Sequence, residues 1–265
     1  MVLFLFLTHL GIGIIFTLVL VSREAGVKFF RFNAGMAAIL VAVGLAFRPA
    51  GVNGVAAAIA LAALLVAEAA IVVYWATVGR GLASIRPFIV WTAIGGGLVC
   101  VLAQAVVNAG DRTLPMEVLT MASFLSSAAL LGGTCTAMVL GHWYLVIPSM
   151  QVGHLQSMVK VHIASMVVRV VVVAAAIFAG VALLQPNPAG GPSFRHYLTS
   201  LDSIFFWQRV LFGLLGPAIL SYLTWETAKI RSTQSATGIL YVDFFTVVVG
   251  EALAKYLLLA TRVPL

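Results

Sequence analysis

Long apolar stretches separated by short polar breaks form the dominant pattern along this chain. Each stretch approaches the roughly 20 residues that an α-helix needs to cross the hydrocarbon core of a bilayer. The pattern predicts an all-α fold, a polytopic integral membrane bundle of about eight transmembrane helices. The predicted segments are Val2–Val21, Phe32–Phe47, Val55–Val78, Pro87–Val107, Pro115–Leu140, Val161–Leu184, Ile204–Thr224 and Gly238–Ala260.

The breaks between these segments are too short to hold a second folding unit. The longest break, from Gln185 to Ser203, contains the sequence PNPAGGPS and predicts one substantial loop. The first segment has no basic leader and is longer than the apolar region of a secretory signal, so we interpret it as a retained helix. We therefore predict a single transmembrane domain over residues 1–265.

The composition indicates the same class. Hydrophobic residues are 62% of the chain and charged residues 9%, whereas soluble domains have about 45–50% and about 25%. Too few polar side chains remain to cover such a core in water, so the lipid bilayer is the expected surrounding. This excludes a soluble globular enzyme, a nucleic-acid-binding domain and a disordered chain. The two cysteines, Cys100 and Cys135, lie in apolar stretches, and we expect them to be buried free thiols.

The distribution of basic residues predicts the orientation of the bundle. The net charge of +7 comes from 15 Lys and Arg against 8 Asp and Glu. Basic residues concentrate on the cytoplasmic side of membrane proteins. The loops after the odd-numbered segments hold eight of them and the opposite side holds four, which predicts both termini outside a bacterial inner membrane. The eight are Arg23, Lys28, Arg31, Arg80, Arg86, Lys160, Lys229 and Arg231.

Six charged side chains lie well inside the predicted segments, where each costs at least about 2.5–3.5 kcal/mol at the bilayer centre. Such residues pair with one another or mark ion and proton paths. Asp243, Glu251 and Lys255 are spaced by multiples of four, so they share one face of the last segment. We expect Glu251 and Lys255 to neutralise each other, or Lys255 to reach outward to the interface. The six are Glu68, Arg169, Arg209, Asp243, Glu251 and Lys255.

Arg169 lies near the middle of Val161–Leu184, on the same face as His162 seven residues earlier. An unpaired guanidinium is too costly at that depth. We therefore expect Arg169 to pair either with Glu68 or with a carboxylate of Gly238–Ala260. Two interpretations stay open, a structural salt bridge and a charged site for a quinone, a proton or an anion.

A second candidate site is the polar and aromatic cluster of His142, Trp143 and Tyr144, which follows the fifth segment. The sixth segment begins on the same side, so we expect His142 and His162 at similar depth on adjacent antiparallel helices. Two histidines so placed suit the axial ligands of a b-type haem, and the cluster equally suits a quinone headgroup. Alternatively, these residues only anchor helix ends at the membrane interface. His9 is expected at the outer end of the first helix, away from this cluster.

Eight helices with both termini outside, closed by the stretch GEALAKY from Gly250 to Tyr256, resemble the membrane anchor subunits of the DMSO-reductase type. With the two histidines and the buried charges, this resemblance indicates an integral membrane subunit of a respiratory or other electron-transfer complex. Such a subunit anchors partners, for example iron–sulfur or cytochrome subunits, and is non-catalytic or quinone-reactive. Quinone and haem b are its candidate cofactors. The resemblance assigns no functional residue.

Two other functions stay open. A secondary transporter or channel would use the buried charges Glu68, Arg169, Asp243 and Glu251 along its path. The sequence has no convincing pair of inverted halves, which disfavours that class. A structural or assembly protein would use the same charges only to fix helix register.

Overall fold

The chain is described here by a computed structural model, which places residues 1–110, 113–147, 150–183, 194–200 and 203–265. The regular elements in these ranges are all helical, as the sequence predicts. The first half contains α1 (Val2–Leu18), the short η1 (Arg23–Ala25), α2 (Gly26–Ala46), α3 (Val55–Thr77), α4 (Arg86–Ala109) and α5 (Leu114–Val146). The second half contains α6 (Val152–Leu183), α7 (Phe194–Thr199), α8 (Ile204–Val210), η3 (Leu211–Leu215), α9 (Gly216–Lys229) and α10 (Thr233–Thr261).

Seven helical stretches of the described chain are long and apolar enough to cross a membrane. One of them is the continuous stretch Ile204–Lys229, which is formed by α8, η3 and α9. The helix α1 is apolar but shorter, because its 17 residues extend for roughly 26 Å against a hydrocarbon core of about 30 Å. The protein is therefore an all-helical integral membrane protein.

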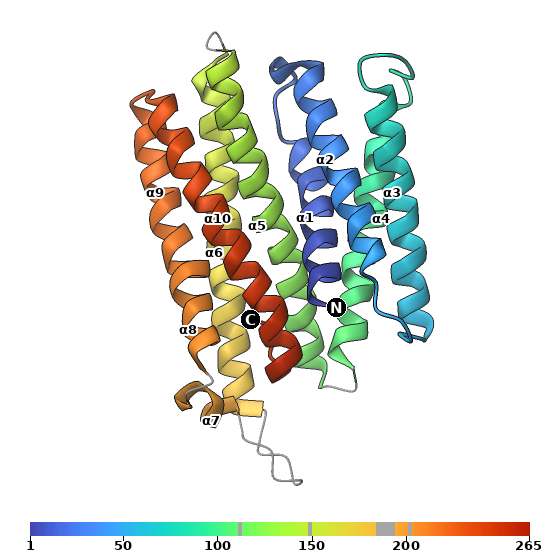
Figure 1. The fold of residues 1–265 in the computed structure, drawn as a ribbon, viewed down its shortest axis with the longest axis vertical. Coiled ribbons are helices and arrows are strands. Elements are labelled where there is room, and N and C mark those ends of the chain that lie inside the picture. Colours follow the sequence, from blue (N-terminus) through green and yellow to red (C-terminus); the bar gives the residue numbers. More distant parts are fainter. Residues whose placement is uncertain (111–112, 148–149, 184–193, 201–202) are drawn as a thin grey trace.

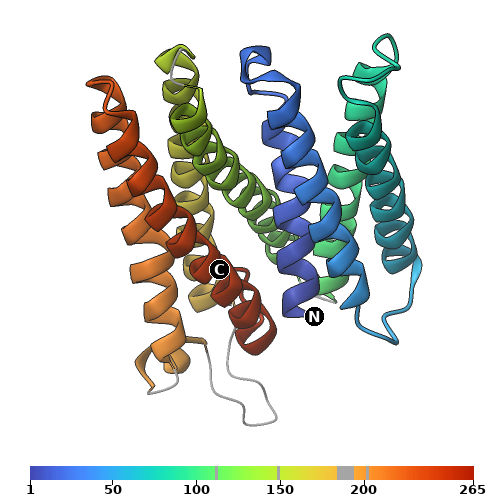
Figure 2. The same cartoon turned by 45° about the horizontal axis from the view of Figure 1, so that its top comes forward.

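The helices form an up-and-down bundle in which α5 is central (Figure 1). On one side, α1 packs against α2 and α5, and α3 packs against α4. On the other side, α10 packs against α9 and α5, and α6 packs against α5 and α9 (Figure 2). In the apolar window of α5, 83% of the residues are buried, against 33–39% in the other six stretches. The other helices thus keep an apolar face for lipid, while α5 supplies the core that joins the two sides.

Two pairs of glycines let helices cross in close contact. The backbones of Gly13 in α1 and Gly132 in α5 touch, and a methyl group on either glycine would collide with the other helix. Gly213 in η3 and Gly250 in α10 form a second contact of this kind. Small residues at such crossings are the usual means by which membrane helices approach one another. The second contact brings α10 against the stretch that carries Arg209.

Several helix boundaries differ from the prediction in a way that matters for the site. The helix α6 begins at Val152 rather than Val161, and α5 continues to Val146 rather than ending at Leu140. The added residues include His154 and Lys160 at the start of α6 and His142 near the end of α5. Their low hydropathy made the predicted segments too short. Membrane helices continue past the hydrocarbon, where polar residues carry no penalty. The helix α7 falls inside the predicted loop from Gln185 to Ser203, and the sequence PNPAGGPS lies outside the described residues.

Candidate functional site: a buried charge network

The buried charges of α6, α8 and α10 converge on Glu251. Arg169 donates a hydrogen bond from Nε to Oε1 at 2.8 Å and from Nη2 to Oε2 at 2.9 Å, so this ion pair is bidentate. Arg209 donates from Nη2 to Oε1 at 2.7 Å. All three side chains are fully buried. Of the two partners predicted for Arg169, the structure therefore selects a carboxylate of α10 and not Glu68.

Hydroxyl groups of α5 complete the surroundings of Arg169. Its Nη1 donates to the main-chain oxygen and the Oγ of Ser123, at 3.0 and 2.8 Å, and lies 3.3 Å from the Oγ of Ser126. Its Nη2 also donates to the main-chain oxygen of Leu265 at 2.9 Å. Every nitrogen of this guanidinium thus has an acceptor, as a buried charge requires.

The position of Arg209 follows from a proline about two turns beyond it in the same stretch. In a regular α-helix the carbonyl of Gly213 would accept a hydrogen bond from the backbone N–H of residue 217, but Pro217 has no N–H. Arg209 donates from Nη1 to that carbonyl oxygen at 2.9 Å, and the chain there forms the π-helical turn η3. Arg209, Gly213 and Pro217 recur every four residues, and this arrangement directs the other guanidinium nitrogen toward Glu251.

Lys255 points into the bundle rather than outward. Its Nζ donates to the Oγ of Ser127 at 2.9 Å and lies 4.7 Å from the ring centroid of Phe124. The residue is only 2% exposed, so the expectation that it reaches the interface is wrong. The physical reason is that α10 continues for six residues beyond it, to Thr261. In the described residues, both ion pairs of Glu251 are with arginines, so three buried cationic side chains surround one carboxylate.

A second buried pair lies on the same faces of α6 and α10. The Nε2 of His162 is 2.7 Å from the Oδ2 of Asp243, and its Nδ1 is 3.0 Å from the Oγ1 of Thr134. Both His162 and Asp243 are fully buried, and the Oδ1 of Asp243 has no hydrogen-bond partner among the described residues. Seven residues separate His162 from Arg169 and eight separate Asp243 from Glu251, which sets the two pairs roughly 10–12 Å apart along the helices.

His9 belongs to the interior and not to a helix end. It lies two turns inside α1 and is fully buried. Its Nε2 is 3.2 Å from the Oε1 of Gln104, and its ring meets Phe124 edge to face with the centroids 4.7 Å apart. The expectation of a location at the outer end of the first helix is therefore wrong, because α1 begins at Val2 and continues past His9 on both sides. The ring of Phe124 contacts both His9 and Lys255.

The structure does not bring His142 and His162 to one depth. The Cα of His162 lies 3.9 Å from the Cβ position of Gly133, and His142 lies nine residues further along α5, a rise of roughly 13 Å. The expectation of similar depth is therefore wrong. It assumed a helix that starts at Val161, whereas α6 starts at Val152 and carries His162 nearly three turns into the bundle. His142 is exposed, and its Nδ1 lies 2.9 Å from the hydroxyl of Tyr241.

Trp143 and Tyr144 form hydrogen bonds at two other places in the structure. Trp143 donates from Nε1 to the main-chain oxygen of Ala25 at 3.0 Å. The Tyr144 hydroxyl donates to the main-chain oxygen of Gln151 and accepts from the N–H of Leu155 at 3.2 Å. These contacts connect the end of α5 to η1 and to the start of α6. The predicted cluster is thus spread over separate contacts and does not converge on one ligand.

Glu68 stands apart from the network. It is half-buried on α3, and its Oε2 has no partner among the described residues. The helix α3 packs against α4 and α2.

Cys100 and Cys135 are buried free thiols, as predicted. Within the described residues, no group of three or more His, Cys, Asp and Glu side chains is placed to hold a metal ion.

The hydroxyl groups of α5 are the part of the site that the prediction missed. Ser123, Ser127 and Thr134 follow one another at intervals of four and seven residues, which places them on one face of a helix. Each of them binds a different ionisable side chain, namely Arg169, Lys255 and His162. The sequence signal that could have located these residues is the stripe of hydroxyl side chains along one face of an otherwise apolar segment.

Searches of known protein families and of curated proteins give no match to this chain. The fold and the site therefore define the class by themselves, an all-helical integral membrane protein with a network of paired charges in its interior.

Proposed function

We propose that the chain is an integral membrane subunit of a respiratory or other electron-transfer complex. In this proposal it crosses a bacterial inner membrane eight times with both termini outside, and it anchors partner subunits that carry iron–sulfur or cytochrome centres. The chain itself is quinone-reactive, and its interior moves the protons that accompany quinone chemistry. The observation that supports this most is the buried pair of His162 and Asp243, in which one carboxylate oxygen has no partner among the described residues.

The two buried pairs have different roles in the proposal. Histidine and carboxylate groups inside membrane spans commonly form proton relays. Oδ1 of Asp243 has no partner among the described residues, so it can take up a proton while the proton shared between Oδ2 and Nε2 moves to His162. Both oxygens of Glu251 are occupied by arginine donors. We therefore assign Arg169, Arg209 and Glu251 to holding the helices in register, and Asp243 to proton transfer.

The quinone headgroup is assigned to His142. Its ring is exposed, its Nδ1 is hydrogen-bonded to the hydroxyl of Tyr241, and its Nε2 has no partner among the described residues. A quinone supplies two-electron, two-proton redox chemistry, and a ring nitrogen of this kind can donate to its carbonyl oxygen. A haem held between His142 and His162 does not fit these residues, because both ring nitrogens of His162 are engaged and the two side chains lie at different depths.

The proposal is tested by isolating the tagged chain from its native membranes in mild detergent. We expect redox subunits to copurify and the preparation to oxidise or reduce a quinone. The Asp243→Asn variant should keep the subunit composition and lose about 10²-fold or more of the turnover, which is the usual contribution of a proton-transfer group. The matched control is Glu24→Gln, because Glu24 pairs with His154 at the same 2.7 Å but in an exposed position. A solitary protein without redox partners, or equal turnover in both variants, overturns the proposal.

A second candidate is a secondary transporter or channel. It is favoured by the excess of buried positive charge, since Arg169, Arg209 and Lys255 surround the single carboxylate Glu251. In that case an anion would pass this cluster, and Glu68 and Asp243 would bind coupling protons. Uptake of a labelled anion into proteoliposomes that contain only this chain is the distinguishing result. Absence of both uptake and redox partners would leave the structural or assembly function.

A further inference from the structure

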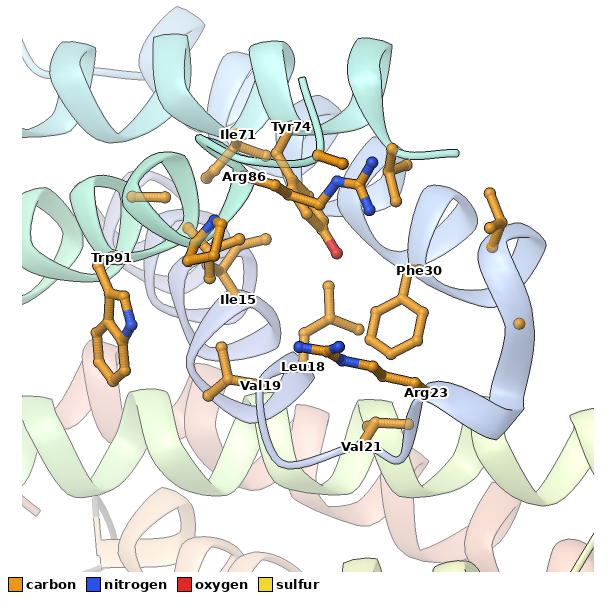
Figure 3. Close-up of a pocket in the computed structure, with 17 residues that line it drawn as sticks. Ile15, Leu18, Val19, Val21, Arg23, Phe30, Ile71, Tyr74, Arg86 and Trp91 are labelled. Carbon is orange, nitrogen blue, oxygen red and sulfur yellow. The ribbon is translucent and has the colours of Figure 1, made fainter. Parts of the chain in front are cut away.

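A cavity of about 540 Å³ opens between the first four helices, and none of the residues that line it belongs to the charge network. Its wall is built by Ile15 and Leu18 of α1, Phe30 of α2, Tyr74 of α3 and Trp91 of α4 (Figure 3). Trp91 is 65% exposed, so the apolar wall continues onto the surface that faces lipid. The volume lies within the range of small-molecule sites, about 300–1,000 Å³.

Two arginines border this cavity from different elements. Arg23 comes from η1 and Arg86 is the first residue of α4, and Figure 3 shows the guanidinium of Arg86 beside the hydroxyl end of Tyr74 and that of Arg23 across the cavity. Among the described residues, nothing accepts a hydrogen bond from Arg23. Arg86 donates from Nη2 to the main-chain oxygen of Gly81 at 3.2 Å, and its Nε is buried with no partner in the described part of the chain.

The charges around the cavity are unbalanced. No Asp or Glu is among the described residues that line it. Glu24, the carboxylate next to Arg23 in sequence, is paired with His154 at 2.7 Å. The cavity therefore combines an apolar wall that opens to lipid with two guanidinium groups that have donors to spare.

We propose that this cavity binds an anionic phospholipid, with its phosphate between Arg23 and Arg86 and an acyl chain along the wall of Ile15, Leu18 and Trp91. Guanidinium groups bind phosphate through paired, charge-assisted hydrogen bonds. The end of the bundle that holds Arg23 and Arg86 also holds the majority of the basic residues. Basic residues favour the cytoplasmic leaflet, where anionic lipids are found. This inference does not depend on the proposed electron-transfer function.

The experiment uses the full chain purified in detergent, titrated with dioleoyl phosphatidylglycerol or dioleoyl phosphatidylcholine and followed by native mass spectrometry. We expect tighter binding of the phosphatidylglycerol, and binding roughly fivefold weaker for each arginine replaced by glutamine, in Arg23→Gln and in the double variant with Arg86→Gln. Arg80→Gln is the matched control, because Arg80 is exposed at the same end of the bundle and does not line the cavity. Its affinity should remain that of the unmodified chain.

A third variant keeps both arginines in place. Ala83 lines the cavity and is exposed in the connection before α4, so Ala83→Trp should fill part of the space and weaken phosphatidylglycerol binding without removing charge. Equal binding of the two lipids, or equal binding by Arg23→Gln and Arg80→Gln, overturns the proposal. Binding of inorganic phosphate alone as tight as that of phosphatidylglycerol overturns it as well, because it would identify free phosphate as the ligand.

Discussion

Arg169 and Glu251 join α6 to α10 through two parallel hydrogen bonds of 2.8 and 2.9 Å, at a place where both side chains are fully buried. The desolvation of two charges offsets much of their attraction, so such a pair adds little net stability relative to apolar residues. Its removal is different, because the loss of one partner leaves the other charge uncompensated. The pair therefore specifies which faces of α6 and α10 meet.

We predict that Arg169→Ala destabilises the protein by about 3–5 kcal/mol, as observed when one partner of a buried pair is removed. Glu251 would retain Arg209 alone, and Ser123 would lose its donor. The measurement is the midpoint of thermal unfolding in detergent, together with the yield in membranes. Lys229→Ala is the control, because Lys229 and Glu226 form a 2.7 Å pair that is nearly half exposed, and exposed pairs contribute about 0–1 kcal/mol. Equal effects of the two variants would contradict the structural role of Arg169.

Lys255 gives a prediction of the opposite sign. Its ammonium group has a serine and an aromatic ring as neighbours and no carboxylate in direct contact among the described residues. Lys255→Met replaces it with an apolar side chain of similar length, which removes one of three buried positive charges. We expect unfolding at an equal or higher temperature, since apolar replacement of buried charges is often neutral or stabilising. A loss as large as that of Arg169→Ala would show that Lys255 supplies essential charge to the network.

The sequence was sufficient for the class of fold and for the Asp, Glu, Lys and Arg residues of the interior, because the free-energy cost of a charge in lipid makes these residues conspicuous in an apolar segment. It was not sufficient for His9, which it placed at a helix end although the side chain is fully buried. It was not sufficient to choose between Glu68 and Glu251 as the partner of Arg169. Both carboxylates lie inside predicted spans, and the choice depends on which helices are neighbours. That order depends on contacts such as the one between Gly213 and Gly250. The sequence does not show that these two glycines meet, because they belong to segments that are far apart along the chain.

The depth of His162 shows a second limit of sequence reasoning. Hydropathy locates the part of a helix that lies in hydrocarbon, and it gives no signal for the turns that continue into water or into the headgroups. The prediction therefore placed His162 in the first turn of its helix. The structure begins α6 at Val152, in front of polar residues such as His154 and Gln156. His162 consequently faces Asp243 and not the region of His142.

The contact between Gly213 and Gly250 is directly testable. A methyl group on Gly250 would overlap the backbone of Gly213 and lie 2.9 Å from the Nη1 of Arg209. We expect Gly250→Ala to separate α10 from η3 and to cost about 1–3 kcal/mol, the usual penalty of overpacking. Gly238→Ala on the same helix is the control, because nothing lies within 4 Å of its added methyl group. That variant should be neutral or stabilised by about 0.5–1 kcal/mol through helix propensity, and an equal loss in both variants would contradict the close crossing.

The orientation of the bundle is tested by cysteine labelling, for which the chain provides a low background, since Cys100 and Cys135 are both buried. Asn53 lies between α2 and α3, and Ser84 lies between α3 and α4, and both are exposed. If both termini are outside, a membrane-impermeant maleimide applied to intact cells should label Asn53→Cys. Ser84→Cys should react only after the membranes are opened. The reverse pattern would contradict the proposed orientation, and labelling of both variants in intact cells would show that α3 does not separate them across the membrane.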